Sequence, residues 1–436
     1  MTSIERLFAL EHFGIKLGLD AMRVLLGALG DPHLRWPSVH VAGTNGKGSV
    51  SAVVERALRD AGLRTGLYTS PHLARIEERI AVSGHEISRL EFVEVLDRTF
   101  AAVDRLVGDG ALAATPTFFE VSTAAAFLHF ADASVDVAVV EVGLGGRYDA
   151  TNVVHPTACA ITTIDFDHER HLGSTLTAIA REKAGIAKPG VPLVVGDVPA
   201  EAWRAIEDAA RAAGAPLVRA TADAVVEAPL VDGHARLTVE TPRGRYGPVR
   251  LALGGSHQAS NGVVAIRLLE AWSEASGRQV SRAAVEAGLA HARWAARLEW
   301  FKAPGGGPGV LVDAAHNPSG ARALASYLAM AKVPPVTLVT SVMADKRVPD
   351  VLGPLLPHVA RVVVTEAATP RAMPAAQVAS IVGSLAPAGT PVSVERDSRL
   401  ALATARQFDA PVLLAGSIFL VGPLRAALVD EGFEST

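Results

Sequence analysis

The sequence has a single cysteine, Cys159, which lies in the apolar run Ala158–Ile161. Without a second cysteine the chain can form no intramolecular disulfide, and it offers no cysteine-based metal site. The chain also lacks an excess of positive charge, because its formal net charge at pH 7 is −4. A general nucleic-acid-binding protein needs a basic face to displace counterions, so we do not expect this class. We expect Cys159 to be a buried, inert thiol.

The sequence has no long uninterrupted apolar run either. The longest uncharged run, Ala372–Val394, is interrupted by prolines and glycines, and the more apolar Ala410–Leu424 is too short to cross a bilayer. The first residues contain Glu5 and Arg6, and no apolar segment follows a basic start, so we expect no targeting signal. We therefore expect a cytoplasmic protein that neither spans a membrane nor binds nucleic acid.

The chain is long enough for two hydrophobic cores. It has 436 residues, of which 49% are hydrophobic and 20% are charged, so we expect two folded domains. Short β-rich apolar runs alternate with alanine-rich amphipathic stretches, a pattern typical of parallel sheets covered by helices. We expect strands at Val135–Val142, Thr157–Ile164 and Val191–Val195, and helices at Val121–Phe130, Leu176–Ala187 and Glu201–Ala213.

The expected secondary structure changes twice in the second half of the chain. Between Ala224 and Leu253 two turn dipeptides separate alternating runs, which predicts antiparallel strands, and a helical region follows from His257 to about His291. A second series of strands is expected at Val310–Val312, Val336–Val342, Val362–Thr365, Val392–Val394 and Val412–Leu414. This series predicts a separate doubly wound domain. We place the domains at residues 1–296 and 297–436.

The most informative segment is the glycine-rich turn Gly43-Thr44-Asn45-Gly46-Lys47-Gly48-Ser49, which follows an apolar run and precedes an expected helix at Val50–Asp60. Closely spaced glycines let backbone N–H groups face an anion, and Lys47 can neutralise phosphate charge. The positive end of the helix adds to this attraction. The segment departs from the pattern G-x-x-x-x-G-K-[ST], since Val41 replaces the first glycine and Gly48 precedes the hydroxyl. An ordinary strand-to-helix turn is the alternative, and the lysine between two glycines disfavours it.

Polar residues close two of the expected strands, at the edge where α/β proteins bind ligands. Glu141 closes one strand, and beside a phosphate loop it is a candidate magnesium ligand. The segment 165–171 closes the next strand with two histidines and three acids, a composition that would suit zinc. Magnesium is favoured because no further Cys or His spacing supports a closed tetrahedral site. A solvated edge carboxylate and a plain polar loop remain the alternatives. Lys183 alone would be a solvated charge on a helix.

A series of ordered motifs over nearly the whole chain resembles the folylpolyglutamate synthase/dihydrofolate synthase family, a branch of the Mur ligase superfamily of ATP-dependent amide-bond-forming enzymes. The motifs are 43–49, Thr69-Ser70-Pro71-His72-Leu73, Glu141–Arg147 with Asp149-Ala150-Thr151-Asn152, Asp167-His168 with Leu172-Gly173, Arg181-Glu182-Lys183-Ala184-Gly185, His257-Gln258 with Asn261, and Asp313–Pro318. The resemblance implies an α/β fold: an N-terminal, P-loop-containing, parallel-sheet ATPase domain and a smaller C-terminal Rossmann-like domain.

The resemblance also implies a set of ligands for ATP and magnesium. The phosphates of ATP are expected on Thr44, Asn45, Gly46, Lys47, Gly48 and Ser49, and further nucleotide contacts on Asn261, Arg297 and Asp313. Magnesium is expected near Ser49, Ser70, Glu141, His168 and Lys183. Lys183 matches the family lysine that is carbamoylated, which turns a cation into a carboxylate-like ligand. The resemblance also allows a monovalent cation such as K+.

The implied reaction joins L-glutamate to dihydropteroate, to folate (poly)glutamates, or to both, through an acyl phosphate. The catalytic residues are expected to be Lys47, Lys183, His168, Glu141 and His316. The pterin-bearing substrate is expected at Gly18, Leu19 and Asp20 of the motif Leu17–Asp20, at Thr117, Phe118 and Phe119, and at Tyr148, with Ser417 near the nucleotide or the glutamate. The alternative for Phe118 and Phe119 is a core pair at a helix start. The family usually has Pro-Gly before the linker arginine, whereas Ala295-Ala296 precede Arg297 here.

Two other functions are weighed against this one. A cell-wall Mur ligase normally carries an extra N-terminal domain for its UDP-sugar, and the phosphate loop at residue 43 leaves no room for it. A non-catalytic nucleotide-dependent switch would have no evident use for the motifs around Lys183 and His168. The sequence leaves open whether the chain makes dihydrofolate, extends polyglutamate tails or does both. Its N-terminal pterin motif and its compactness favour both. We expect a monomer.

Overall fold

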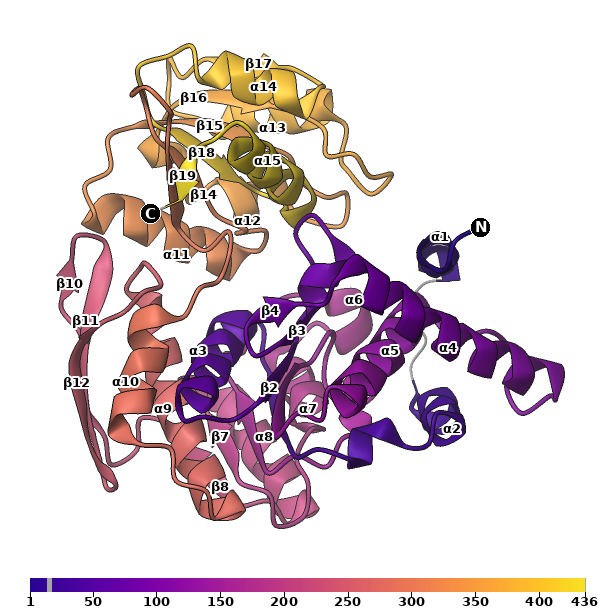
Figure 1. Cartoon of the computed structure of the whole chain (residues 1–436). Coiled ribbons are helices and arrows are strands. Elements are labelled where there is room, and N and C mark those ends of the chain that lie inside the picture. Colours follow the sequence, from indigo (N-terminus) through magenta and orange to yellow (C-terminus); the bar gives the residue numbers. More distant parts are fainter. Residues whose placement is uncertain (14–17, 436) are drawn as a thin grey trace. The chain divides into compact units, whose positions relative to one another are not determined.

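The computed structural model describes residues 1–13 and 18–435 of the chain (Figure 1). Its internal contacts divide the chain into two compact units. Unit 1 comprises Met1–Val226, Thr238–Val249 and Ser260–Ala292, and unit 2 comprises Glu227–Leu237, Arg250–Ala259 and Arg293–Thr436. Each unit contains its own large sheet.

Unit 1 is built on an 8-stranded sheet with the strand order β4-β3-β2-β5-β1-β6-β7-β8. The strands from β2 to β8 in this order pair in parallel, whereas β3 and β4 are added antiparallel at one edge. Strands β1 and β5 are buried along their whole length, as expected of central strands with both faces covered. The bounds are β1 Ser38–Ala42, β2 Thr65–Tyr68, β3 Ile80–Val82, β4 His85–Glu86, β5 Val137–Glu141, β6 Ala158–Ile161, β7 Leu193–Val195 and β8 Leu217–Arg219.

Helices cover this sheet and close its core. Their bounds are α1 Ser3–Ala9, α2 Asp20–Ala28, α3 Lys47–Asp60, α4 Arg89–Gly108, α5 Phe118–Asp132, α6 Glu169–Leu172, α7 Leu176–Ala184, α8 Ala200–Ala213, α9 His257–Ser276 and α10 Arg282–His291. Short 3₁₀ turns lie at Leu10–Phe13, Pro32–Leu34, Ile76–Arg79 and Ala150–Val153. Helix α5 begins where it does because Thr117 and Glu120 form a capping box around its first turn.

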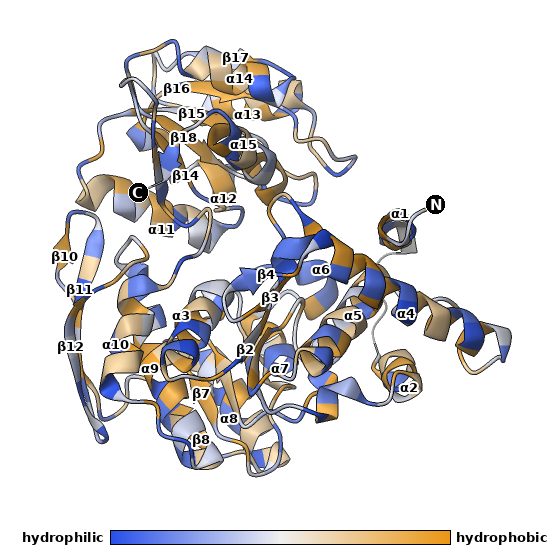
Figure 2. Cartoon of the chain, viewed as in Figure 1, coloured by the Kyte–Doolittle hydropathy of each residue, from blue (hydrophilic) through white to orange (hydrophobic). Residues whose placement is uncertain are grey.

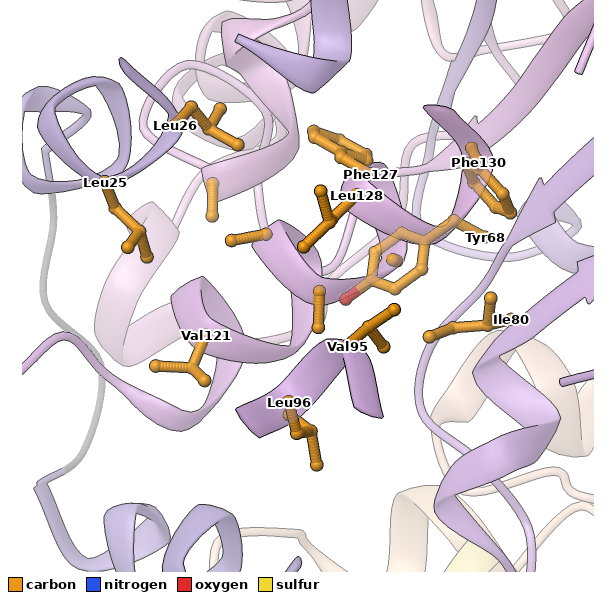
Figure 3. Close-up of a cluster of buried hydrophobic side chains, with 14 of the residues drawn as sticks. Leu25, Leu26, Tyr68, Ile80, Val95, Leu96, Val121, Phe127, Leu128 and Phe130 are labelled. Carbon is orange, nitrogen blue, oxygen red and sulfur yellow. The ribbon is translucent and has the colours of Figure 1, made fainter. Parts of the chain in front are cut away.

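One apolar cluster of unit 1 gathers side chains from α2, β2, β3, α4 and α5 (Figure 3). Tyr68 at the end of β2 lies in this cluster, and its hydroxyl is 2.9 Å from the hydroxyl of Thr123 on α5. Because Tyr68 is fully buried, this hydrogen bond offsets the cost of removing a phenol from water. The cluster fixes the end of β2 and the start of α5.

The predicted antiparallel segment forms a separate small sheet. Its strands are β9 Val225–Glu227, β10 Leu230–Val231, β11 His234–Thr241 and β12 Gly244–Arg250. They run in the order β10-β11-β12, with β9 also paired to β11.

Unit 2 contains a 7-stranded sheet with the order β17-β16-β15-β18-β14-β13-β19. The five strands from β17 to β14 pair in parallel, and β13 and β19 are antiparallel additions. Figure 2 shows hydrophobic colour along β16 of this sheet and hydrophilic colour on α6 of unit 1. The bounds are β13 Glu299–Lys302, β14 Val310–Val312, α11 Pro318–Met330, β15 Val336–Thr340, α12 Val348–Leu352, a 3₁₀ turn Leu356–His358, β16 Val359–Val364, α13 Ala375–Leu385, β17 Val392–Val394, α14 Ser398–Ala405, β18 Val412–Ala415, α15 Ile418–Asp430 and β19 Glu434–Ser435.

The predicted α/β fold class is confirmed, with differences at the element boundaries. The helix after the glycine-rich turn begins at Lys47 rather than Val50, because the lysine is already in the first helical turn. The expected helical region from His257 to His291 is two helices, since Gly277 is in the left-handed region and Ser281 caps a new start. Cys159 is buried, as expected, and burial raises the pKa of its thiol to about 12. Within residues 1–13 and 18–435, no helix is long and apolar enough to span a membrane.

Two helical glycines of unit 1 provide a matched test of packing. A Cβ at Gly288 of α10 would lie 2.7 Å from the Val53 carbonyl oxygen of α3, whereas a Cβ at Gly27 of α2 would meet nothing within 4 Å. Gly288→Ala should therefore lower the free energy of unfolding by about 1–3 kcal/mol. Gly27→Ala should raise it by about 0.5–1 kcal/mol, because the unfolded chain loses entropy. Urea unfolding measures both; equal effects of the two substitutions would contradict the close approach of α10 to α3.

Candidate active site

The glycine-rich turn lies between β1 and α3, and two of its glycines have no room for a side chain. Gly43 has φ 147° and Gly46 has φ 86°, both in the region that favours glycine. A Cβ on Gly43 would clash with the Thr162 hydroxyl, and one on Gly46 would clash with the amide oxygen of Asn261. The turn therefore brings its backbone close to Asn261, which was expected to contact the nucleotide.

Residues after β6 hold this turn in place. The Thr44 amide donates to the Thr163 carbonyl at 2.8 Å, and the Asn45 amide donates to the Thr163 hydroxyl at 3.0 Å. The Thr162 hydroxyl donates to the Asn45 carbonyl at 2.6 Å. Sequence reasoning missed Thr162 and Thr163, although paired hydroxyls directly after a strand that adjoins β1 are a recognisable signal. These bonds hold the backbone of the turn in one conformation.

Two lysines converge on the Gly43 carbonyl. Lys47 Nζ donates to Gly43 O at 3.2 Å and to Thr44 O at 3.3 Å, while Lys183 Nζ donates to Gly43 O at 2.9 Å. Lys183 is only 5% exposed, so its interpretation as a solvated surface charge is wrong. Burial, and then the charge of Lys47, lower the pKa of Lys183 to about 7. An amine of this kind exists partly in its neutral, nucleophilic form near neutral pH.

Glu141 faces the same turn from the neighbouring strand. It is the last residue of β5 and pairs with Val41 of β1 in the parallel register. Its side chain is buried, and its Oε1 lies 3.9 Å from Lys47 Nζ. A buried carboxylate beside a phosphate-binding turn fits a hard cation such as Mg²⁺.

The other predicted metal ligands are placed at ends of elements. Ser49 lies buried in the first turns of α3, Ser70 follows β2, and His168 is the N-terminal flanking residue of α6 with φ 51°. The His168 side chain is 42% exposed, and its Nε2 is 3.9 Å from an Asp167 oxygen. In the part of the chain that the structure describes, no group of three or more His, Cys, Asp or Glu side chains could hold a metal ion. Glu141 and the Ser49 hydroxyl are nevertheless oxygen donors of the kind magnesium prefers.

The glycine-rich segment 143–149 after β5 lies against two parts of the site. A Cβ on Gly143 would clash with the Phe119 ring, and one on Gly146 would lie 2.7 Å from the Lys183 carbonyl oxygen. The Arg147 amide donates to the Glu182 carbonyl at 2.8 Å. We call this segment the 143–149 loop. It contacts the start of α5 on one side and the end of α7 on the other.

An aromatic group forms at the start of α5. Phe118 and Phe119 are partly buried and pack against the cluster of Figure 3, as does Leu19, so the core-pair interpretation of these rings is partly correct. The Phe8 ring lies 5.7 Å from that of Phe118. The buried guanidinium of Arg79 lies 5.1 Å from the Phe118 ring, and no sequence pattern had indicated this contact.

The remaining predicted substrate residues of unit 1 are more exposed. Tyr148 is 38% exposed, and the Arg147 guanidinium lies 5.0 Å from its ring. Gly18 has φ 137°, and Asp20 at the start of α2 pairs with Arg23 at 3.2 Å. Leu17, the first residue of that motif, lies outside the described residues.

Unit 2 gathers its four predicted residues around the ends of β14 and β18. Asp313 is buried and accepts hydrogen bonds from the amides of Leu298 and Ala315, both at 2.9 Å. Burial raises the pKa of Asp313, and the charge of Arg297 opposes that rise. His316 Nδ1 donates to the Ala314 carbonyl at 2.8 Å.

Ser417 caps helix α15 and is joined to the same edge. Its hydroxyl accepts from the Phe419 amide at 3.2 Å, and the neighbouring Gly416 amide donates to the Ala315 carbonyl at 2.9 Å. The linker before Arg297 has an unusual backbone, because Ala296 has φ 54°, in the region that favours glycine. The position where the family usually has glycine therefore keeps a glycine-like conformation here.

Comparisons with known proteins agree with this geometry. Residues 41–269 match the Mur ligase middle domain, and residues 296–418 match the Mur ligase, glutamate ligase domain. The dihydrofolate synthase/folylpolyglutamate synthase of Mycobacterium tuberculosis is 39% identical over 81% of this chain and 75% of that protein. The folylpolyglutamate synthase of Lacticaseibacillus casei is 33% identical over 93% of each chain.

Solved structures give the same relationship. Mycobacterium tuberculosis folylpolyglutamate synthase complexed with ADP superposes with a TM-score of 0.89 at 34% identity, covering 98% of this chain and 99% of that chain. E. coli FolC in complex with DHPP and ADP superposes with a TM-score of 0.85 at 29% identity, covering 99% of this chain and 98% of that chain.

Lys47 should be needed for turnover and much less for folding. Its side chain is 17% exposed and bonds only carbonyls of its own turn besides its approach to Glu141, so Lys47→Ala should cost about 1 kcal/mol of stability. Loss of the phosphate-facing charge should lower kcat/KM for ATP by about 100-fold or more. Arg56→Ala on the same helix, where Arg56 pairs with Asp60, is the matched control. Near-normal turnover of Lys47→Ala would exclude the phosphate-binding role.

Proposed function

Because the chain belongs to the folylpolyglutamate synthase/dihydrofolate synthase family of Mur ligases, we propose that it is an ATP-dependent ligase that joins L-glutamate to a pteroyl carboxylate. The observation that carries the proposal is the convergence of Lys47 and Lys183 on the Gly43 carbonyl, with Glu141 beside them. A structural turn would not need two partly desolvated ammonium groups at one carbonyl. A phosphate-transfer site does need concentrated positive charge in a preformed cradle.

The chemistry requires activation of a carboxylate. A carboxylate accepts an amine poorly because oxide is its leaving group, so the γ-phosphoryl group of ATP is first transferred to it and ADP leaves. Phosphoryl transfer depends mainly on positioning and charge neutralisation. The glutamate amine then attacks the acyl phosphate, a tetrahedral intermediate forms, and phosphate leaves as the amide bond forms. Exclusion of water protects the acyl phosphate from hydrolysis.

We assign the ATP phosphates to the turn from Thr44 to Ser49, with Lys47 as the mobile cation. Support comes from Gly46, whose φ of 86° favours glycine, and from the start of α3 at Lys47, where the first backbone amides have no partner within the helix and can face an anion. Asn261 is assigned to the nucleotide because its amide borders Gly46. Arg297 and Asp313 are assigned to the nucleotide from the second domain, on the strength of the motifs and of their proximity to each other.

Ser49, Ser70, Glu141, His168 and Lys183 are assigned to magnesium. When bound, Mg²⁺ supplies charge neutralisation for the transferred phosphoryl group. Lys183 as a plain ammonium would repel the ion, whereas its carbamate would attract it. Support for the carbamate comes from the burial of Lys183 and its lowered pKa. A monovalent cation such as K+ is compatible with this set.

The acceptor is proposed to be dihydropteroate or a reduced folate. Relatives named dihydrofolate synthase/folylpolyglutamate synthase, and an E. coli relative seen with DHPP and ADP, favour both activities in one chain. The pterin is assigned to Gly18, Leu19, Asp20, Thr117, Phe118, Phe119 and Tyr148. His316, as a catalytic residue, and Ser417 are assigned to the nucleotide or to the incoming glutamate. We propose that the protein works as a monomer in the cytoplasm, with domains at residues 1–296 and 297–436.

The decisive experiment measures ADP release that depends on L-glutamate, with dihydropteroate and tetrahydrofolate as separate acceptors. Activity with both identifies a bifunctional enzyme, and activity with one assigns that synthase alone. Glutamate-independent ATP hydrolysis, or no release with either acceptor, would contradict the proposed ligation. A UDP-sugar acceptor tests the alternative of another Mur-type amide ligase.

Carbamoylation of Lys183 can be tested by ¹³C NMR with labelled bicarbonate. The carbamate forms on the neutral amine, and because the pKa of Lys183 is lowered to about 7, the neutral fraction rises as pH increases through 7. At fixed dissolved CO₂, a carbamate resonance should therefore grow between about pH 6 and pH 8. Lys183→Gln should abolish it. Lys188→Gln is the matched control, since burial also lowers the pKa of Lys188; loss of the resonance in that variant instead would move the modification to Lys188.

A further inference from the structure

A buried chain of polar groups links β1 to the 143–149 loop and has no part in the proposed chemistry. His40, on β1 just before the phosphate-binding turn, is fully buried, and its Nε2 lies 2.9 Å from the Thr151 hydroxyl. That hydroxyl donates to Asp149 Oδ1, which also accepts from the Thr151 amide at 3.0 Å. The other carboxylate oxygen, Oδ2, accepts from the Leu144 amide at 2.7 Å.

The direction of these hydrogen bonds is fixed by the imidazole. Burial, and then the charge of Lys188, lower the pKa of His40 to about 3, so the ring is neutral. Its Nδ1 has no hydrogen-bond partner among the described residues, so a proton there would be an unsatisfied buried donor. The ring proton is therefore on Nε2, which donates to the Thr151 oxygen. The Thr151 hydroxyl in turn gives its single proton to Asp149.

A second side chain of the same motif holds the other end of the loop. The Asn152 amide nitrogen donates to the Arg147 carbonyl and to the Gly185 carbonyl, both at 3.0 Å. One side chain thus ties the loop to the turn directly after α7. Asn152 is buried, so water does not compete strongly for these bonds.

The loop transmits this restraint to two groups that the reaction needs. Gly143 lies directly against the Phe119 ring, and Gly146 lies directly against the Lys183 backbone. The Arg147 amide adds a hydrogen bond to the Glu182 carbonyl, one residue before Lys183. A shift of the loop would therefore move the pteroyl-facing ring and the lysine together.

We propose that His40 and Thr151 are positioning residues that, through Asp149 and its bond to the Leu144 amide, lock the 143–149 loop and thereby hold Phe119 and Lys183 in register with the phosphate-binding turn. The kinetic consequence rests on the proposed ligase function, whereas the lock itself does not. Neither residue needs to touch a substrate for this role.

The test compares Thr151→Val, which removes the hydroxyl at constant shape, with Thr151→Ser, which keeps it. Thr99→Val is the matched control, because the buried Thr99 hydroxyl on α4 bonds only the Val95 carbonyl. Hydrogen–deuterium exchange is measured on the full chain without substrates. Thr151→Val should speed exchange of the Leu144 and Arg147 amides about tenfold or more, with α4 unchanged, and Thr151→Ser should restore protection.

Steady-state kinetics supply the second readout. Thr151→Val should lower kcat by roughly tenfold to hundredfold and raise KM for the pteroyl acceptor, while the dissociation constant of ADP stays within about threefold. A purely structural role would lower the fraction of folded enzyme, and with it the apparent kcat, but would leave KM for the pteroyl acceptor unchanged. His40→Leu should change these constants in the same direction, and adding it to Thr151→Val should cost little more, because both act through the Thr151 hydroxyl.

The outcomes separate the two proposals. If the Leu144 amide of the wild-type chain exchanges rapidly, the 143–149 loop is not locked. This result overturns the inference even if Thr151→Val does not fold. Uniformly faster exchange in Thr151→Val, or equal effects of Thr151→Ser and Thr151→Val, overturns it as well. A wild-type chain with a protected loop but no glutamate-dependent turnover would support the lock and defeat the proposed function instead.

Discussion

The arrangement of unit 1 depends on one close approach, in which the backbone of Gly43 passes beneath the Thr162 hydroxyl. Any side chain at Gly43 would clash there, and the positive φ would be strained as well. This approach leaves the Gly43 carbonyl directed at Lys47 and Lys183, so both ammonium groups are held by a single acceptor. The backbone keeps these two like charges together, and burial, followed by the charge of Lys47, lowers the pKa of Lys183. The two lysines are thus brought together by the fold itself.

The burial of strands and the position of their ends explain which parts of the structure could be predicted from the sequence. Strand β14 is buried along its whole length and reads directly as an apolar run, so its exact bounds could be predicted. The exact bounds of β17 could also be predicted, although this edge strand is largely exposed, because two valines follow the turn residues Gly389 and Pro391. Polar residues at strand ends share an edge, so Glu141 and the glycine-rich turn could be placed together without coordinates. The antiparallel strands β3, β4, β13 and β19, which extend one end of each large sheet, were not predicted, because each is too short or too exposed to show a clear apolar run.

Contacts between distant side chains were beyond sequence reasoning for a different reason. Taken alone, Lys183 was expected to be a solvated charge on a helix. The fold shows that α7 places its ammonium group at the Gly43 carbonyl, 140 positions earlier in the sequence. Likewise, His40 reads as one polar residue within an apolar strand, and its partner Thr151 lies in a 3₁₀ turn far along the chain. Hydrogen bonds of this range depend on strand order, which local patterns do not encode. The motifs identified the family, but the geometry explains why the Asp149–Asn152 segment belongs with the loop before it.

The backbone of Ala296 has a consequence for the linker it precedes. An alanine in the left-handed region costs roughly 1–2 kcal/mol relative to the right-handed one, whereas a glycine has little preference. Here the Ala296 carbonyl accepts from the Ala314 amide at 3.0 Å and its amide donates to Glu299 at 2.9 Å, and Glu299 is itself clamped by Arg425. These bonds hold the residue against its own intrinsic bias. If these bonds were lost, a glycine would sample both the left-handed and the right-handed regions, whereas this alanine would favour the right-handed region. The backbone conformation that precedes Arg297 is therefore held in part by Glu299, whose ion-pair partner Arg425 lies more than a hundred residues away in the sequence.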